Sequence, residues 1–137
     1  MERFEEAKRW FAQALRDLKA AKDSLEDSNY EWSCFQAQQA AEKALKALLY
    51  AYGRSSRAHS IVELLAIARE IGVFSEDLLV YARELDRHYI PSRYPNAFVS
   101  GYPGMYYDEA TAKRALEAAE KIMEWVKTWL RSLGVEI

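Results

Sequence analysis

The sequence predicts an all-α protein, an antiparallel up-and-down bundle of four long helices plus one short helix. Every segment with regularly spaced apolar residues repeats near 3.6 residues, and none alternates with period two as a half-buried strand does. All three prolines lie within residues 91–103, so the rest of the chain lacks this helix breaker. Most connections between the helices are short, which favours antiparallel neighbours.

The first two helices follow from spacing and composition. Apolar residues recur at spacings of three and four over residues 4–25, which predicts a long amphipathic helix. After a turn at residues 27–29, Tyr30–Tyr52 contains no Gly or Pro and is rich in Ala, Gln and Leu, so a second long helix is expected, with Gly53 ending it. Its polar positions face either a partner subunit or solvent, and they are Gln36, Gln38 and Gln39.

Capping residues predict the next two helices. Ser60 and Glu63 have the spacing of a capping box at the start of a third, shorter helix that ends near Gly72. Ser75 is expected to cap a fourth helix, with an acidic first turn that suits the helix dipole. That helix is expected to run to about Tyr89.

The segment from residue 90 to residue 107 is expected to be an ordered loop. It holds all three prolines and two glycines, so no helix passes through it. Disordered segments are poor in aromatic residues, and this one is rich in them: Tyr94, Phe98, Tyr102, Tyr106 and Tyr107. Asp108 then caps a last helix, which ends at Gly134.

One domain, residues 1–137, is expected, because a chain of this length buries roughly two thirds of its unfolded surface in a single core. The content of 50% hydrophobic and 29% charged residues is typical of a globular protein. The single cysteine, Cys34, cannot form an internal disulfide, which favours a cytoplasmic location. No uncharged run approaches a signal or membrane-spanning segment, so a membrane is not an expected partner.

Charge and composition also restrict the possible ligands. A net charge of −2 and a pI near 5.8 argue against coating nucleic acid, because such binding neutralises many phosphates. There is no basic recognition helix, so sequence-specific DNA binding is not expected, and any contact with RNA or a nucleotide must be local. Two histidines and one cysteine do not make a metal site, and the acidic residues lack ligand spacing. No metal or other cofactor is expected.

Four stretches of the sequence, taken in order, resemble the HEPN family. They are Trp10 with Asp17 and Leu18, the run Cys34–Lys46, His59–Ser60–Ile61, and Tyr89–Pro95. The resemblance covers nearly the whole chain, and residues 85–96 contribute most of its specificity. It implies an antiparallel helical bundle that is usually dimeric. It also implies a minimal nucleotidyltransferase encoded nearby, with which HEPN proteins often form a toxin and antitoxin pair, and some members cut RNA without a metal.

The resemblance further implies a catalytic pattern. RNase-active members carry an Arg followed after four to six residues by a His, late in the bundle and near the dimer interface. The spacing occurs at Arg83 to His88 and at Arg54 to His59, and its late position favours the first pair as catalytic. A histidine can exchange the proton of a ribose hydroxyl near neutral pH, and an arginine stabilises charge on the phosphorane.

Helix geometry affects how this pair would work. Residues five apart on a regular helix point about 140° from each other, so Arg83 and His88 would meet more easily across the two-fold axis of a homodimer. Four tryptophans and nine tyrosines exceed what one small core hides, which also favours a dimer. In the alternative, Glu84 and His88 form a surface pair and Arg83 is an ordinary solvated charge.

The candidate residues for nucleotide or RNA binding are His59, Arg57, Arg93 and Tyr94. His59 lies beside Arg54 and Arg57 at the positive end of the third helix, which together make a modest anion site. Alternatively, His59 only hydrogen-bonds the backbone at the helix start. Arg93 and Tyr94 either hold a phosphate and stack a base, or they close the proline loop, with Arg93 bound to helix-end carbonyls.

Three functions remain open at this point. The first is a HEPN protein of a nucleotidyltransferase-linked toxin–antitoxin module that acts as a metal-independent endoribonuclease, with His88 as acid and base. The second is a non-catalytic nucleotide-binding or assembly module that docks a nucleotidyltransferase through Arg93, Tyr94 and the aromatic loop. The third is an inert helical dimer that serves only as a scaffold.

Overall fold

A computed structural model describes residues 2–137, and the regular secondary structure of this part of the chain is helical, without a strand. Three helices are longer than 20 residues: α1 (Glu2–Glu26), α2 (Tyr30–Ala51) and α6 (Glu109–Ser132). The others are shorter: α3 (Ile61–Glu70), α4 (Leu79–Asp86), the four-residue α5 (Pro103–Tyr106), and the 3₁₀ turns η1 (Glu76–Leu78) and η2 (Pro95–Ala97).

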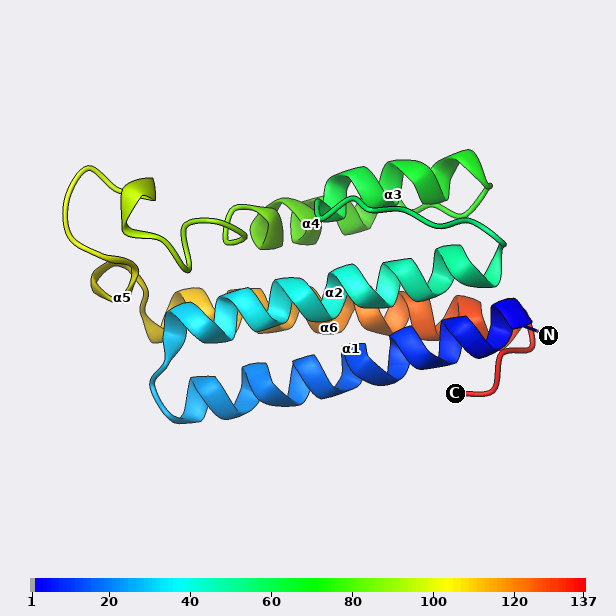
Figure 1. The fold of residues 1–137 in the computed structure, drawn as a ribbon, viewed down its shortest axis with the longest axis horizontal. Coiled ribbons are helices and arrows are strands. Elements are labelled where there is room, and N and C mark those ends of the chain that lie inside the picture. The colour runs from blue at the N-terminus through cyan, green and yellow to red at the C-terminus, as the bar shows by residue number, and fades with distance from the viewer. Residues whose placement is uncertain (1) are drawn as a thin grey trace.

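The helices form an up-and-down bundle around α2 (Figure 1). Helix α1 packs on one side of α2 and the α3–α4 pair on the other, while α6 closes the bundle behind. The four helices α1, α2, α4 and α6 alternate in direction, as predicted. Helix α3 is the additional one, and it runs in the same direction as α2 because residues 53–60 first return along α2.

Helix lengths differ from the prediction, since three helices are long and α4 has only eight residues. Helix α4 ends at Asp86 rather than near Tyr89. At His88 and Tyr89 the backbone amides donate to carbonyls three residues earlier, 3.0 Å from His88 N to Leu85 O and 3.3 Å from Tyr89 N to Asp86 O. Pro91 follows, and proline disfavours helical backbone at the residue before it. The chain therefore tightens into turns before the proline is reached.

Helix α2 is buried on nearly every side, and its small residues explain how three neighbours can approach it. The fully buried alanines on this helix are Ala37, Ala40, Ala41, Ala44 and Ala47. Leu45, Leu48 and Leu49 fill the space that remains toward the core. Truncating one such leucine to alanine costs about 2–5 kcal/mol. The glutamines were expected at a partner or solvent, but Gln38 is fully buried.

Three of the predicted helix boundaries are confirmed by their caps. The Ser60 side chain accepts a hydrogen bond from Glu63 N at 3.1 Å, and that of Asp108 accepts one from Thr111 N at 2.8 Å. Gly53 follows α2 with a φ of 78°, the left-handed backbone that favours glycine. Ser75, in contrast, precedes η1 without a side-chain capping bond.

The loop between α4 and α6 contains two short helical turns that the sequence did not predict. Both η2 and α5 begin at a proline, Pro95 and Pro103. Proline is tolerated at the first position of a helix because the amide it lacks has no partner there. Phe98 and Tyr106 stack within the loop at a centroid distance of 4.3 Å, and Tyr106 Oη donates to Ser100 O at 2.8 Å. The aromatic residues order the loop, as expected.

Candidate functional site

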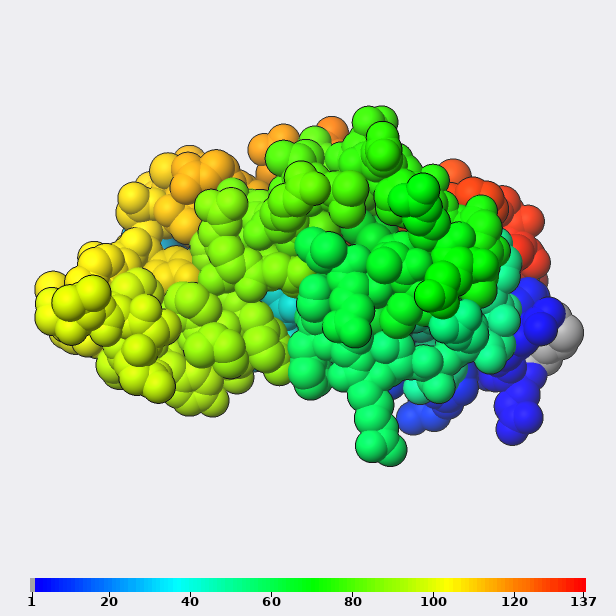
Figure 2. All heavy atoms as spheres, turned by 90° about the horizontal axis from the view of Figure 1, so that it is seen from above, coloured from blue at the N-terminus to red at the C-terminus, as the bar shows by residue number. Residues whose placement is uncertain are grey.

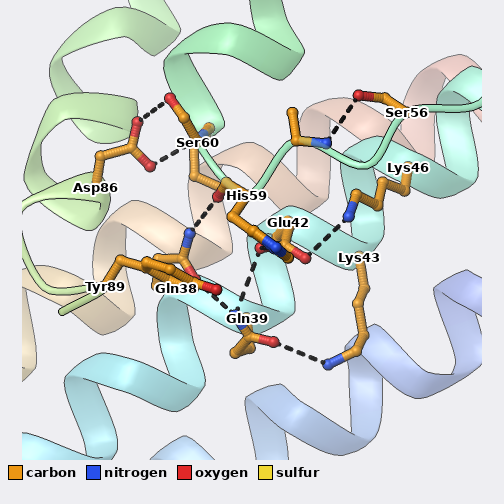
Figure 3. A network of polar contacts seen from close by, with 12 residues as sticks. Gln38, Gln39, Glu42, Lys43, Lys46, Ser56, His59, Ser60, Asp86 and Tyr89 are labelled. Carbon is orange, nitrogen blue, oxygen red and sulfur yellow. Dashed lines mark hydrogen bonds and ion pairs between the residues drawn. The ribbon is translucent and has the colours of Figure 1, made fainter. Parts of the chain in front are cut away.

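His59 lies on the segment between α2 and α3, and three residues contact it, two at its imidazole and one at its backbone carbonyl (Figure 3). Its ring stacks on Tyr89 with 5.2 Å between centroids and 15° between planes. Its Nδ1 lies 3.3 Å from Glu42 Oε1 on α2, and its carbonyl oxygen accepts a hydrogen bond of 2.7 Å from Gln38 Nε2. The side chain nevertheless remains 59% exposed. The ring contacts a carboxylate rather than the backbone at the start of α3.

A chain of polar side chains on α2 supports this histidine. Glu42 and Lys46 form an ion pair with 3.1 Å between Oε2 and Nζ, and their side chains are only 6% and 7% exposed. Gln39 connects Glu42 to Lys43, with 3.5 Å from its Nε2 to Glu42 Oε1 and 3.4 Å from Lys43 Nζ to its Oε1. Lys43 also binds Asp17 on α1 at 2.5 Å. The network connects His59 to the long helices α2 and α1.

Asp86 occupies the start of α3, beside His59. Its carboxylate accepts hydrogen bonds from Ile61 N at 2.7 Å, Val62 N at 3.0 Å and Ser60 Oγ at 2.8 Å. These amides are the groups with which a helix start would bind an anion. The anion site expected there is therefore filled by the protein's own carboxylate.

A surface pocket of about 390 Å³ opens next to His59. It is lined by His59, Ser60, Glu63, Asp86, Tyr89, Ile90 and Pro91. In the space-filling view, cyan atoms of α2 show through a gap between the segment after α4 and the segment that leads into α3 (Figure 2). The residues lining the pocket thus come from two segments that are more than twenty residues apart in sequence.

Arg57 and Arg54 lie on the same segment as His59. Arg57 is exposed, and among residues 2–137 no carboxylate forms an ion pair with it. Arg54 instead binds Glu70 on α3, with 3.1 Å between Nη2 and Oε2. Of the two predicted arginines, Arg57 is the one whose charge is not neutralised by a partner.

Arg93 is engaged in closing the loop, and Tyr94 is exposed beside it. The Nε and Nη2 atoms of Arg93 donate to Tyr89 O at 2.9 and 2.7 Å. Its guanidinium carbon lies 4.3 Å from the Phe35 ring centre, 4.7 Å from that of Tyr89 and 5.0 Å from that of Tyr94. This geometry agrees with the structural alternative in that Arg93 binds a backbone carbonyl, but that carbonyl lies in the turn after α4 rather than at a helix end. Their role in nucleotide binding stays a prediction.

The second histidine, His88, is buried, whereas His59 is exposed. The side chain of His88 is 4% exposed, Nε2 lies 2.9 Å from Glu84 Oε2, and Nδ1 lies 2.9 Å from Tyr107 Oη. Burial lowers the pKa of His88, against the opposing effect of Glu84. Burial also raises the pKa of Tyr107, so its hydroxyl stays protonated and donates to Nδ1. Both imidazole nitrogens of the neutral ring have partners inside the chain.

Arg83 and His88 are not brought together within the chain, since Arg83 is exposed and His88 buried. Helix α4 ends between them at Asp86, so the angle of a regular helix does not describe their separation. Glu84 and His88 do pair, as in the alternative interpretation, but the histidine is buried and the glutamate only 18% exposed, so the pair does not lie on the open surface. The composite site at a two-fold axis stays a prediction.

Metal and thiol chemistry receive no support from the described side chains. Within residues 2–137, no three His, Cys, Asp or Glu side chains gather as a metal site would require. Cys34 is buried in α2, and burial raises its pKa to about 12, which keeps the thiol protonated. No helix in this part of the chain has the length and apolar character of a membrane span.

Sequence reasoning missed the residues that position His59. Tyr89, Glu42 and Lys46 were placed in stretches that resemble the HEPN family, but none of them was given a role beside His59. One signal was present, because Glu42 and Lys46 are charged residues four apart in an otherwise Ala-rich and Leu-rich helix. Such a pair on a buried face is unusual and indicates a specific polar contact.

The whole bundle is similar to known proteins. A family model described as the HEPN domain matches residues 7–129, which include both histidines. The chain is 28% identical over 134 residues to "Putative toxin MJ1304" of Methanocaldococcus jannaschii, an alignment that covers 91% of this chain and 88% of that protein.

Solved structures extend this similarity to three dimensions. The protein TT1696 from Thermus thermophilus is 43% identical with a TM-score of 0.88, over 91% of this chain and 98% of that one. The archaeal HEPN homologue ST0689 is 40% identical with a TM-score of 0.77, over 90% and 96%. A HEPN domain protein of Thermotoga maritima is 33% identical with a TM-score of 0.72, over 90% and 98%.

Proposed function

Because this chain belongs to the HEPN family, we propose that it is the toxin of a toxin–antitoxin module and that it acts on RNA as a metal-independent endoribonuclease. The observation that carries the proposal is the exposed imidazole of His59, fixed by Glu42 and Tyr89 at the edge of an open pocket. The similarity to a protein named as a toxin supports the assignment to such a module.

The pocket has the size and the chemistry for one nucleoside of an RNA chain. Its volume of about 390 Å³ lies in the range of small-ligand pockets, about 300–1,000 Å³. The outer face of the His59 ring is free to stack a base. The carboxylate of Glu63 at the pocket wall accepts hydrogen bonds from ribose hydroxyls or base amino groups.

Positive charge for the phosphate comes from the segment that carries His59. Arg57 is exposed two residues before it and has no internal ion-pair partner among the described residues. Asp86 and Glu63 make the inside of the pocket acidic. The phosphate therefore binds outside the pocket, toward Arg57, while the nucleoside enters it.

The test is an incubation of purified protein with end-labelled single-stranded RNA in the presence of a chelator. We expect cleavage that is insensitive to the chelator and leaves a cyclic phosphate, and we expect Arg57→Gln to weaken RNA binding. Lys121→Gln, which removes a charge from an exposed position on α6, is the matched control. RNA that is neither bound nor cut would contradict the proposal.

A second candidate function, the docking of a nucleotidyltransferase, is favoured by the loop between α4 and α6. Its exposed hydrophobic residues are Tyr94, Val99, Tyr102, Met105 and Tyr106. Contiguous exposed apolar side chains mark protein interfaces. Co-expression with a minimal nucleotidyltransferase encoded nearby should give a complex that Val99→Ser with Tyr102→Ser disrupts. A complex that survives this double variant would remove the loop from the interface.

A further inference from the structure

We propose that the groove between α1 and α2 is a second RNA-binding site, which holds a nucleotide of the RNA strand at a distance from the segment after α4. This inference rests on the proposed function, because it takes RNA as the ligand. The groove has a volume of about 570 Å³, and its lining residues are Arg9, Trp10, Ala12, Gln13, Arg16 and Lys43. Three observations lead to the proposal: the charge of the lining, the indole of Trp10, and a connection to the pocket beside His59.

The lining of the α1–α2 groove is cationic. Three of its six residues carry a positive charge, and none is a carboxylate. The pocket beside His59 differs, because Glu63 and Asp86 line it. In a chain with a net charge of −2, cations gathered around one hollow raise the local concentration of anions. A phosphate therefore fits the α1–α2 groove better than it fits the acidic pocket.

Arg16 is the cation of the groove that no carboxylate neutralises. The residues three or four positions away on α1 are Ala12, Gln13, Lys19 and Ala20. None of them is acidic, so no ion pair forms along the helix. Elsewhere in residues 2–137, no carboxylate forms an ion pair with Arg16 either, and its side chain is exposed. Such a guanidinium is available to bind two oxygens of one phosphate.

The other two cations have acidic partners. Arg9 pairs with Glu6, and the side chain of Arg9 remains 77% exposed. Lys43 pairs with Asp17, whose second oxygen accepts a hydrogen bond of 2.9 Å from the Gln13 amide. Three cations against two carboxylates leave one net positive charge. That charge is the one on Arg16.

Trp10 supplies the aromatic wall of the groove. Its ring packs on Tyr50 with 5.5 Å between centroids, and Lys46 Nζ lies 5.8 Å from its centre. These contacts from α2 fix the indole, while part of it lines the groove. Proteins bind single-stranded nucleic acid with such a pairing, because bases stack on the ring and cations contact the backbone. An acidic peptide would use the cations alone, whereas RNA uses both.

Side-chain contacts connect the groove to the pocket beside His59. Lys43 lines the groove, and its Nζ lies 3.4 Å from Gln39 Oε1. Gln39 Nε2 lies 3.5 Å from Glu42 Oε1, and His59 Nδ1 lies 3.3 Å from the same oxygen (Figure 3). Three contacts therefore separate the two sites. One RNA strand can occupy both, with the groove holding nucleotides that flank those beside the segment after α4.

The first test measures the affinity of the whole protein for labelled single-stranded RNA at several salt concentrations. Arg16→Gln should weaken binding by about 5-fold or more. It should also lower the slope of log affinity against log salt by about 0.7, the value for one phosphate contact of a single strand. Lys121→Gln on α6 is the matched control, with affinity and slope near those of the parent. RNA binding by Arg16→Gln with the affinity and slope of the parent would overturn the inference and leave the proposed function intact.

The second test separates stacking from charge. Trp10→Leu should lower RNA affinity by about 5-fold or more without changing the salt slope, because a stacked base contributes no counterion release. Trp10→Phe keeps an aromatic ring and should lose less, and circular dichroism checks that both variants are folded. Equal losses in Trp10→Leu and Trp10→Phe, or none in either, would remove the indole from the site and overturn the inference.

The third test uses strand length and a protein competitor. The affinity of the parent should rise from a dinucleotide to a strand of about ten nucleotides, and Arg16→Gln with Trp10→Leu should flatten this rise. Arg16→Gln should leave any complex with a nucleotidyltransferase intact. Loss of that complex with normal RNA affinity would assign the groove to a protein partner and overturn the inference. RNA bound by neither the parent nor any variant would contradict the proposed function, and this inference with it.

Discussion

The two histidines have the same kind of neighbour and opposite surroundings. Each imidazole lies against a glutamate, His59 against Glu42 and His88 against Glu84. In the first pair the glutamate is buried and the histidine exposed, whereas in the second the histidine is buried and the glutamate is 18% exposed. Residue types alone therefore do not identify an acid–base group. Within the described chain, both ring nitrogens of His88 have hydrogen-bond partners, whereas only Nδ1 of His59 has one.

Replacing each glutamate by alanine should give the largest difference between the two regions in the free energy of unfolding. Glu42→Ala leaves Lys46 charged and buried without its partner, which costs about 3–5 kcal/mol in the free energy of unfolding. Glu84→Ala should cost less, because Glu84 is partly exposed and His88 is neutral. Urea unfolding followed by circular dichroism measures both values. A larger cost for Glu84→Ala would reverse our view of which region holds the buried charge.

Asp86 joins the two regions, because it ends α4 and caps α3. Asp86→Ala removes the acceptor of two backbone amides and of Ser60 Oγ, and such caps contribute about 0.5–2 kcal/mol. We expect RNA cleavage to fall as well, since the segment of His59 leads directly into this cap. Asp86→Asn, which keeps an acceptor oxygen, is the control and should lose less. Normal RNA cleavage by a destabilised Asp86→Ala variant would show that the cap of α3 is not needed for cleavage.

The pH dependence of stability is expected to report the buried histidine, His88. The pKa of His88 is lowered from its ordinary 6.5 by burial, so below about pH 6.5 the unfolded chain binds a proton that the folded chain does not. His88 therefore contributes stability that is present above this pH and is lost as the pH falls, at a slope of up to about 1.4 kcal/mol per pH unit. Urea unfolding across this range should show the slope, and His88→Gln should reduce it. A slope that is unchanged in His88→Gln would assign it to another group.

The smallest effect is expected at the other arginine–histidine spacing. Arg54 binds Glu70 in a pair that is exposed on both sides, and such pairs contribute about 0.2–1 kcal/mol. Arg54→Ala should therefore change stability very little, and it should leave RNA cleavage near the parent value, because the guanidinium is directed to α3. Arg57→Ala is the comparison, with weaker RNA binding. Cleavage lost in Arg54→Ala would restore this arginine to the site.

The helices could be predicted from the sequence because their signals are local. The apolar spacing of residues 4–25, the cap at Ser60 and the cap at Asp108 each depend on residues within one or two turns. The early end of α4 could not be predicted so well, because apolar residues continue past Asp86 while the backbone already tightens toward Pro91.

The site could be predicted only in part, because its contacts join distant residues. His59 meets Glu42 across 17 positions, and His88 meets Tyr107 across 19. The residues next to each histidine in sequence do not predict which imidazole is buried. The predicted binding residues His59 and Arg57 lie together on one segment, whereas Arg93 is held by Tyr89 O and Arg83 is exposed while His88 is buried. Only the three-dimensional arrangement separates these cases.

The accessibility of the two imidazoles can be measured directly with diethylpyrocarbonate, which acylates exposed neutral imidazole nitrogens. Mass spectrometry of the digested protein reports the rate at each histidine, with and without single-stranded RNA. We expect His59 to react rapidly and His88 at least about 10-fold more slowly, because the side chain of His88 is 4% exposed. RNA should protect His59 and leave His88 unchanged. Equal reactivity of the two histidines, or protection by RNA at His88 alone, would contradict the account.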